Sequence, residues 1–313
     1  MVGAVLLCPG QGAQRVGMGR DLAERHPPAR AVFEEADAAL GIALSRLMWE
    51  GPEEELTLTH NAQPAILIHS LAVHVLVRDR LAPVAAAGHS LGEYTAYAAL
   101  GALDLADAVR LVRLRGELML EAGARRPGTM AAVIGLEGDV VAAVCAEASA
   151  GDSVVVAANF NAPDQTVISG DPPAVERAGV ALKDAGAKRV LPLKVSGAFH
   201  SPLMAPAQAG LQGALNRVPF SDPAAPVIAN ASAEPITQAA AARRRLGEQL
   251  TAPVRWVESM RQAATLAGGA AFVEIGPGSV LGGLLKRIVP GVAATSLGTA
   301  AEVEAFLDER GGL

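Results

Sequence analysis

Short apolar runs alternate along this chain with longer segments of helical periodicity, and this alternation restricts the fold more than any other feature. The first apolar run, residues 4–8, leads into a glycine-rich loop over residues 9–19. A helix is predicted over residues 21–40, with a break near Pro27. Strands that alternate with helices are typical of α/β proteins, so the pattern predicts an α/β fold.

The same alternation continues through most of the chain. Pro64 falls in the first turn of the next predicted helix, which is amphipathic, and proline is tolerated there. The remaining segments of this kind are predicted helices over 62–81, 105–123 and about 240–265, strands over 83–88, 225–230 and 271–276, and a loop over 277–289.

Residues 128–196 have a different pattern from their surroundings. Strand-like and helical segments follow one another there as β-α-β-β-α-β, which is a ferredoxin-like signature. We therefore expect a small ferredoxin-like domain inserted into a larger one. The large α/β domain would then consist of residues 1–127 and residues 197–313.

Charge and hydropathy exclude several classes of function. The 313-residue chain has a formal net charge of −6 with both signs interspersed, whereas nucleic-acid binding needs a basic face. No apolar run approaches the ~20 residues of a membrane span. The N-terminal run lacks a basic start, so we interpret it as a buried strand rather than a signal peptide. We expect a cytoplasmic enzyme or binding protein with no nucleic-acid or membrane partner.

The cysteines and histidines do not indicate a metal site. Cys8 and Cys145 lie far apart in apolar contexts and are expected to be small buried hydrophobic side chains. The chain has neither a C-x-x-C nor an H-E-x-x-H motif, and its six histidines are scattered. We therefore expect no metal bound by the protein.

The segment Gly88-His89-Ser90-Leu91-Gly92 lies between a predicted strand and a predicted helix. Gly-x-Ser-x-Gly in this context is the pattern of a nucleophile elbow, where the glycines permit a sharp turn that exposes the serine oxygen. The serine would also lie near the N-terminal end of the next helix, whose free N–H groups can hold an oxyanion. The motif alone leaves two interpretations open, a nucleophilic serine and an ordinary turn serine.

A nucleophilic serine needs a base, and His200 is the most suggestive distant histidine. In VSGAFHSPLM it follows a strand and a glycine and lies on a loop, where catalytic groups usually gather. His89, next to Ser90, is expected to pack or bond locally instead. The other histidines lie in or near helical segments, where core and surface roles dominate.

Seven segments of this chain together resemble one known family. They occur in the order CPGQGAQRVGMG, GHSLGEY, ADAVRLVRLRGELM, NFNAPDQTVISG, AFHSPLM, TAPVRW and EIGPGSVLGGLLKR. The chain resembles the bacterial malonyl-CoA:acyl carrier protein transacylases of fatty acid synthesis, and it is similar to the acyltransferase domains of polyketide synthases. The resemblance extends from about residue 4 to residue 295. It implies a large domain related to α/β-hydrolases together with a ferredoxin-like small domain.

The resemblance also implies a role for several residues. Ser90 would accept the malonyl group as an ester, and His200 would take the serine proton and return it to the departing thiol. The backbone N–H groups of Gln11 and Leu91 would hold the oxyanion. The main chain of Gln249 would orient the histidine, so that a Ser-His dyad replaces a triad.

Two further residues would select the acyl group. Arg115 would pair with the free carboxylate of malonyl, since a guanidinium offers a planar fork to both carboxylate oxygens. An acetyl group would leave that buried cation unpaired. Phe199, directly before His200, resembles the aromatic residue of malonyl-selecting acyltransferases, and its ring would crowd a methyl branch.

The resemblance implies malonyl-CoA as donor and an acidic, transiently bound acyl carrier protein as acceptor, with no cofactor in the enzyme itself. A monomer is the default expectation. One alternative is a stand-alone acyltransferase that loads carrier domains of a polyketide synthase. Another is a Ser-His esterase or thioesterase with Asp164, Asp171 or Asp184 as its acid. A non-enzymatic, degenerate scaffold is a third alternative, which the retained Ser90, His200 and Arg115 argue against.

Overall fold

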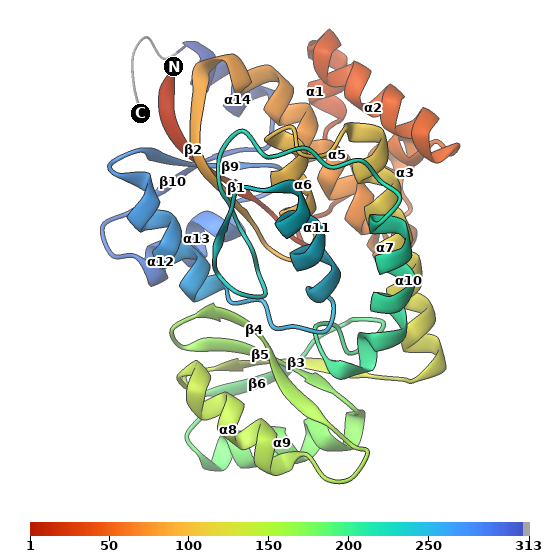
Figure 1. The fold of residues 1–313 in the computed structure, drawn as a ribbon, viewed down its shortest axis with the longest axis vertical. Helices are drawn as coiled ribbons and strands as arrows, with labels where there is room; N and C mark the ends of the chain where they lie inside the picture. Colours follow the sequence, from red (N-terminus) through yellow and green to blue (C-terminus); the bar gives the residue numbers. More distant parts are fainter. Residues whose placement is uncertain (309–313) are drawn as a thin grey trace.

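The computed structural model describes residues 1–308, which form two sheets with helices around them. Figure 1 shows the larger sheet in the upper half of the molecule and the smaller one, in yellow and green, below it. The larger sheet has six strands in the order β10-β9-β1-β2-β7-β8. Its strands are β1 (Val2–Cys8), β2 (Leu81–Gly88), β7 (Val227–Ile228), β8 (Pro235–Ile236), β9 (Ala271–Ile275) and β10 (Ala294–Leu297).

The larger sheet is parallel except at its edge, where β8 runs antiparallel to β7. Successive side chains of β1 point to opposite faces, because a strand has a period of two residues. Leu6 and Cys8 belong to one buried cluster, and Val5 and Leu7 belong to another on the opposite face. A sheet that is apolar on both faces needs helices on both faces, which is the arrangement of α/β proteins.

The helices connect these strands and cover the sheet (Figure 1). They are α1 (Arg20–Arg25), α2 (Pro27–Leu40), α3 (Leu44–Glu50), α4 (Glu53–Thr57), α5 (Thr59–Val77), α6 (Gly92–Ala99), α7 (Leu105–Arg125), α10 (Ala205–Leu215), α11 (Ala239–Glu248), α12 (Trp256–Ala267), α13 (Val280–Ile288) and α14 (Ala300–Asp308), with short 3-10 turns at Arg78–Arg80 and Pro202–Met204.

The smaller sheet contains the predicted β-α-β-β-α-β unit, element by element. Its elements are β3 (Thr129–Ile134), α8 (Gly138–Ala148), β4 (Val155–Ala162), β5 (Gln165–Gly170), α9 (Pro172–Asp184) and β6 (Arg189–Pro192). The strands are antiparallel in the order β4-β5-β3-β6, and α8 and α9 pack on one face over an apolar cluster. The two-part α/β architecture predicted from the sequence is therefore confirmed. All of these elements lie within residues 128–196, whose status as a separate domain stays a proposal.

The two sheets are joined where β4 meets the loop before α12. Phe160 N donates to Val254 O at 2.9 Å, and Val254 N donates to Ala158 O at 2.8 Å. This short parallel pairing continues the edge of the smaller sheet into a loop of the larger unit. It places β4 next to the carboxyl ends of the larger sheet's strands, the edge where ligands bind in open α/β sheets.

The helix predicted over 62–81 differs from the structure in three respects. It begins at Thr59 and ends at Val77, it is buried over most of its length rather than amphipathic, and Pro64 lies inside it rather than in its first turn. A proline inside a helix leaves one carbonyl without its usual partner, here that of His60. Arg113 Nη1 donates to this carbonyl at 3.2 Å, which explains how the helix accommodates the proline.

Two other sequence predictions were wrong. The single helix expected over about 240–265 is two helices, α11 and α12, because Pro253 cannot donate a helical hydrogen bond and disfavours helix in the residue before it. The loop expected over 277–289 contains helix α13. The first N–H groups of that helix donate to the buried carboxylate of Glu274, which comes from strand β9 and cannot be read from the local sequence.

Candidate active site

Ser90 lies on a turn that only glycine neighbours permit. Strand β2 ends at Gly88 and helix α6 begins at Gly92, so the chain reverses within three residues. A Cβ on Gly88 would lie 1.9 Å from Gly92 C, and a Cβ on Gly92 would lie 2.1 Å from Cys8 O. Ser90 itself has φ 53°, a left-handed conformation that is uncommon for any residue other than glycine. The local structure is therefore the predicted nucleophile elbow.

Asn230, directly after strand β7, holds both sides of this turn. Its Oδ1 accepts from Ser90 N at 2.7 Å, and its Nδ2 donates to Gly88 O at 2.7 Å. One side-chain amide thus satisfies two buried backbone groups that no helix or strand can satisfy. Sequence reasoning missed Asn230, although a polar residue at the end of an apolar strand is a signal that points to this edge of the sheet.

His200 lies against the Ser90 side chain. Its Nε2 is 2.8 Å from Ser90 Oγ, and its Nδ1 is 3.1 Å from Gln249 O and 3.2 Å from Ala252 O. Carbonyl oxygens only accept hydrogen bonds, so Nδ1 carries the proton and Nε2 is free to accept from the serine hydroxyl. The structure brings Ser90, His200 and the main chain of Gln249 together as the resemblance implies.

The break between α11 and α12 supplies these two carbonyl groups. Gln249 caps the C-terminal end of α11, where the last carbonyl groups of a helix have no partner in the helix itself. The histidine uses this free acceptor in place of a carboxylate. No acid therefore occupies the third position of a triad.

The neutral form of His200 is strongly favoured. Burial, together with the cation of Arg115, lowers the pKa of His200 from 6.5 to about 3. The imidazole is therefore uncharged at neutral pH, which is the state required of a general base.

Arg115 is a buried cation without a carboxylate partner among residues 1–308. Its Nη1 donates to Gln63 Oε1 at 2.6 Å, and its Nη2 donates to Ser90 Oγ and to Gln249 Oε1, both at 2.9 Å. The guanidinium also lies over the ring of Tyr94, 5.7 Å from its centre. Only 1% of the residue is exposed, and burial lowers its pKa. Arginine nonetheless keeps its charge in proteins, so the charge is held by neutral groups alone.

The neighbouring arginines of the sequence behave differently. Arg110 pairs with Asp107, Arg113 pairs with Glu117 on the same helix, and Arg126 pairs with Asp171. Each of these is an exposed or partly exposed ion pair of the ordinary surface kind. Arg115 is thus set apart from them by burial and by its lack of an acid.

The backbone N–H groups of Gln11 and Leu91 are both free. Neither donates to any atom of the described chain, whereas the adjacent Gly12 N is bound to Gln14 Oε1. The loop that carries Gln11 passes close to the elbow, since a Cβ on Gly10 would lie 2.6 Å from His89 O. The side chain of Gln11 is occupied with Thr59 at 2.8 Å and does not compete for the space.

A cavity of about 330 Å³ opens onto Ser90 and His200. Phe199 lines it and is 6% exposed, and the smaller sheet contributes Met130, Asn159 and Val167. The mouth therefore lies between the two parts of the molecule. The full lining comprises Gln11, Gly12, Gln14, Thr57, His89, Ser90, Met119, Met130, Asn159, Asn161, Val167, Leu193, Lys194, Val195, Phe199 and His200.

His89 lines the same cavity but makes no hydrogen bond to the Ser90 hydroxyl in the described chain. Its Nε2 lies 2.8 Å from Asn161 Oδ1, and its ring packs against Trp256 at 5.4 Å between centres. His89 is therefore engaged elsewhere, in agreement with the interpretation that it is not the base.

None of the three aspartates proposed as the acid of an esterase is hydrogen-bonded to His200. Two of the three candidates are paired with arginines, Asp164 with Arg287 and Asp171 with Arg126, and Asp184 lies at the end of helix α9. His200 Nδ1 faces carbonyl groups instead. These residues therefore do not form the Ser-Asp-His triad that is usual in such hydrolases.

Two buried side chains beside the site were missed by sequence reasoning. Gln63 holds Arg115 from helix α5, and Glu93 on helix α6 accepts from Gln249 Nε2 at 2.6 Å. Their local sequences give no sign of burial, because polar residues near a helix start are usually solvated. Their contacts become evident only in the folded structure, where segments that are distant in the sequence lie together.

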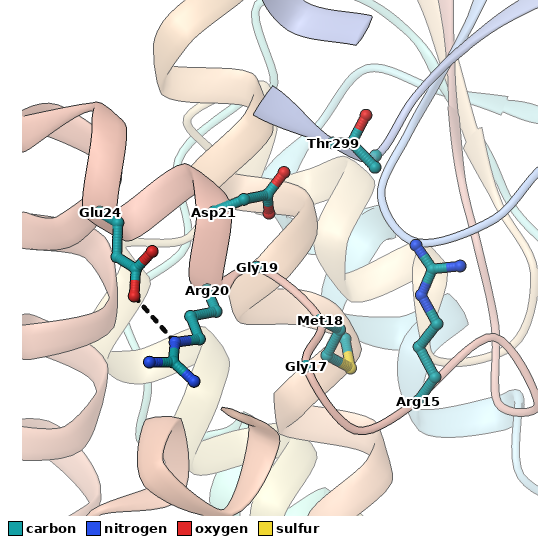
Figure 2. A pocket seen from close by; sticks show the side chains of 9 residues that line it. Arg15, Gly17, Met18, Gly19, Arg20, Asp21, Glu24 and Thr299 are labelled. Carbon is teal, nitrogen blue, oxygen red and sulfur yellow. Dashed lines mark hydrogen bonds and ion pairs between the residues drawn. The ribbon is translucent and has the colours of Figure 1, made fainter. Parts of the chain in front are cut away.

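A second cavity of about 360 Å³ lies where residues 15–21 approach residues 298 and 299 (Figure 2). Charges of both signs line it, and Arg20 is paired there with Glu24 at 2.8 Å. None of the predicted site residues lines this cavity. The chemistry is therefore assigned to the cavity at Ser90.

Two further observations concern metal and membrane. Within residues 1–308, no group of three or more His, Cys, Asp or Glu side chains is arranged to hold a metal ion. Cys8 and Cys145 are free and buried, as expected. Across the same residues, none of the helices combines the length and the apolar character needed to cross a membrane.

Comparison with known proteins gives a consistent picture. Residues 5–303 match the family described as acyl transferase domain. The chain is 46% identical to the malonyl CoA-acyl carrier protein transacylase of Bacillus subtilis, over 90% of this chain and 89% of that one. It is 45% identical to the protein of the same name from Escherichia coli K12, over 96% and 97% of the two chains. A malonyl-transacylase solved in complex with a holo acyl carrier protein of a type II polyketide synthase superimposes with a TM-score of 0.93 at 42% identity, over 99% of this chain and all of that one.

The neutral state of His200 predicts a measurable pH dependence of stability. In the unfolded chain this histidine gains a proton below pH 6.5, whereas in the folded protein it stays neutral down to about pH 3. This histidine therefore lowers the free energy of unfolding as pH falls through this window, by about 2 kcal/mol at pH 5. Between pH 7.5 and pH 5 the free energy of unfolding of the His200→Asn variant should fall by about 2 kcal/mol less than that of the wild type, as measured by denaturant titration. Parallel pH curves for the two proteins would contradict the assignment.

Proposed function

The chain belongs to the acyl transferase family, and on this premise we propose that it transfers a malonyl group from malonyl-CoA to the phosphopantetheine thiol of an acyl carrier protein. The observation that carries the proposal is the guanidinium of Arg115, buried without an acid and 2.9 Å from the oxygen of Ser90. A cation in that position suits an acyl group that carries its own carboxylate. The names of the relatives support the same donor and acceptor.

The first half-reaction forms a malonyl ester on Ser90. His200 Nε2 removes the hydroxyl proton while Oγ attacks the thioester carbonyl, and the tetrahedral intermediate then expels the CoA sulfur. The protonated histidine returns its proton to that sulfur. In the second half-reaction the carrier's thiol attacks the ester, and the same histidine passes the proton from the thiol back to Ser90.

The free N–H groups of Gln11 and Leu91 are proposed to hold the oxyanion of both tetrahedral intermediates. Preorganised donors of this kind are worth roughly 3 kcal/mol each in the transition state. The N–H of Leu91 lies at the start of helix α6, where the helix dipole adds to the same effect.

Arg115 and Phe199 are proposed to select the acyl group at two positions, its free carboxylate and its α-carbon. The malonyl carboxylate would accept from the guanidinium, which now donates to neutral oxygens only. The Phe199 ring, on the wall of the cavity, would leave no room for a branch at the α-carbon. Discrimination against acetyl thus comes from an unpaired cation, and discrimination against a branched unit comes from shape.

The carrier protein is proposed to approach the mouth of the cavity transiently. If the carrier is acidic, basic side chains can guide it, and Lys188, Arg189, Lys286 and Arg287 are proposed for this role. Arg287 is already engaged with Asp164 and Gln165, which leaves the lysines and Arg189 as the freer charges. The malonyl group would serve fatty acid synthesis, with the loading of polyketide carriers as the alternative that the type II complex supports.

The remaining expectations follow from the chemistry. Each step exchanges one acyl bond for another and moves one proton, so we propose that no cofactor takes part. A monomer as the working unit stays a prediction. The cytoplasmic location expected from the sequence stays a prediction.

The nucleophile is tested with Ser90→Ala. Without the hydroxyl no ester can form, so incubation with malonyl-CoA should leave the mass of the intact protein unchanged, whereas the wild type gains one malonyl group. Ser221→Ala, at an exposed serine, should acylate like the wild type. A malonyl adduct that persists in Ser90→Ala would refute the assignment of Ser90 as the nucleophile.

The carboxylate contact is tested with Arg115→Ala. Loss of two charge-assisted hydrogen bonds should lower kcat/KM for malonyl-CoA about 100-fold, while the rate with acetyl-CoA falls much less. Arg110→Ala, an exposed position on the same helix, serves as the control and should change neither rate. An unchanged ratio of malonyl to acetyl transfer in Arg115→Ala would place the carboxylate elsewhere.

The steric role of Phe199 is tested with Phe199→Ser. Removal of the ring opens space for one methyl group, a difference worth roughly 10-fold or more in relative rate. The ratio of methylmalonyl to malonyl transfer should therefore rise in a competition read by mass spectrometry. If the ratio does not rise, a residue other than Phe199 excludes the methyl branch at the α-carbon.

A further inference from the structure

Glu93 is a buried acid directly behind the nucleophile, and the mechanism above gives it no part. It is 1% exposed and lies on helix α6, three residues after Ser90. Its Oε2 accepts from Gln249 Nε2 at 2.6 Å and from Asn230 N at 3.0 Å, while Oε1 has no partner within the described chain. The carboxyl group therefore joins three segments that are far apart in the sequence.

These contacts leave one orientation for the side-chain amide of Gln249. Its Nε2 faces two acceptors, Glu93 Oε2 and Ser90 O at 3.0 Å, and its Oε1 faces the donor Arg115 Nη2. A flipped amide would set Oε1 against two acceptors and set the NH₂ group against the guanidinium. Glu93 thus contributes the shorter of the two contacts that decide the orientation.

Gln249 is the junction between the base and the cation. Its main-chain oxygen is 3.1 Å from His200 Nδ1, and its side-chain oxygen is 2.9 Å from Arg115 Nη2. A shift of the Gln249 side chain would therefore change where the guanidinium points. Misplacement of a binding group by about 1 Å can cost about 100-fold in rate.

The amide also separates two opposite charges. If Glu93 contacted Arg115 directly, an incoming carboxylate would have to displace it from a strong ion pair. With one amide between them, the ionised acid offsets the buried cation, while Arg115 Nε stays without a partner in the described chain. This arrangement explains why a buried arginine in a substrate site has a buried acid nearby but not against it.

We propose that Glu93 is a positioning residue for acyl selection, which fixes the amide of Gln249 and thereby aims Arg115 at the carboxylate of the substrate. The proposal rests on the proposed function, because it assigns a role within malonyl transfer. It assigns Glu93 no contact with the substrate.

The test compares malonyl-CoA with acetyl-CoA in three variants. Glu93→Met fills the space but removes the acceptor, and the ratio of kcat/KM for the two donors should fall about tenfold or more. Glu93→Gln keeps an acceptor at the same place and should hold the ratio within about threefold of the wild type. Glu274→Gln is the matched control, since Glu274 is also a buried carboxylate that accepts from backbone N–H groups, and its ratio should not change.

The ratio of the two kcat/KM values is the deciding readout. Misfolded protein lowers both values by the same factor, so its effect cancels in the ratio. A Glu93→Met protein with the wild-type ratio would overturn the proposal, and so would an equal fall in Glu274→Gln. A fall in Glu93→Gln as large as that in Glu93→Met would overturn the role of the hydrogen bond. Failure of the wild type to transfer malonyl would instead refute the proposed function, so the two failures are distinguishable.

Discussion

The close approach of helix α6 to the end of strand β1 is the contact on which the rest of the site depends. Gly92 lies so near Cys8 O that no side chain fits between them, and Gly88 is equally confined by Gly92. This contact forces the chain to turn within three residues and leaves Ser90 exposed at the carboxyl edge of the sheet. Every other group of the site is then placed relative to that oxygen: a histidine on one side, a guanidinium on another, one free amide at the turn and a second on the loop after β1.

The electrostatics of the site follow from the burial of one positive charge. Arg115 has lost water and has gained only neutral acceptors, an aromatic face and a carboxyl group one amide away. The same charge helps to keep His200 unprotonated. Burial also raises the pKa of Glu93 to about 7, although hydrogen bonds and Arg115 oppose the rise. A site of this kind is poised for an anionic ligand, since a carboxylate would relieve the least satisfied group in it.

Much of this could be predicted from the sequence, but only where the signal is local. The alternation of strands and helices, the ferredoxin-like unit and the elbow all depend on neighbouring residues, and the structure has each of them. Two of the errors occurred where a distant group changes the local preference: Arg113 satisfies the carbonyl left free by Pro64, and Glu274 caps helix α13. The break between α11 and α12 is different, because its cause, Pro253, lies within the segment itself. Asn230, Gln63 and Glu93 were missed because each contacts groups more than fifty positions away in the sequence. Ser90 and His200 were candidates from their local sequence, and the resemblance defined their expected roles. The expected roles of Arg115 and Gln249 came from the resemblance alone.

The left-handed backbone at two positions has a consequence for how this scaffold can change. Ser90 and His200, with φ 53° and φ 56°, are two of the three non-glycine residues in the described chain that adopt this conformation. Such conformations cost on the order of 1–3 kcal/mol each and persist only because the surroundings enforce them. A lineage that lost the activity could relieve this strain by placing glycine at position 90, whereas glycine at position 200 would also empty the space of an imidazole that is only 4% exposed. Glycine at position 90 in a related sequence would mark a protein released from selection for acyl transfer.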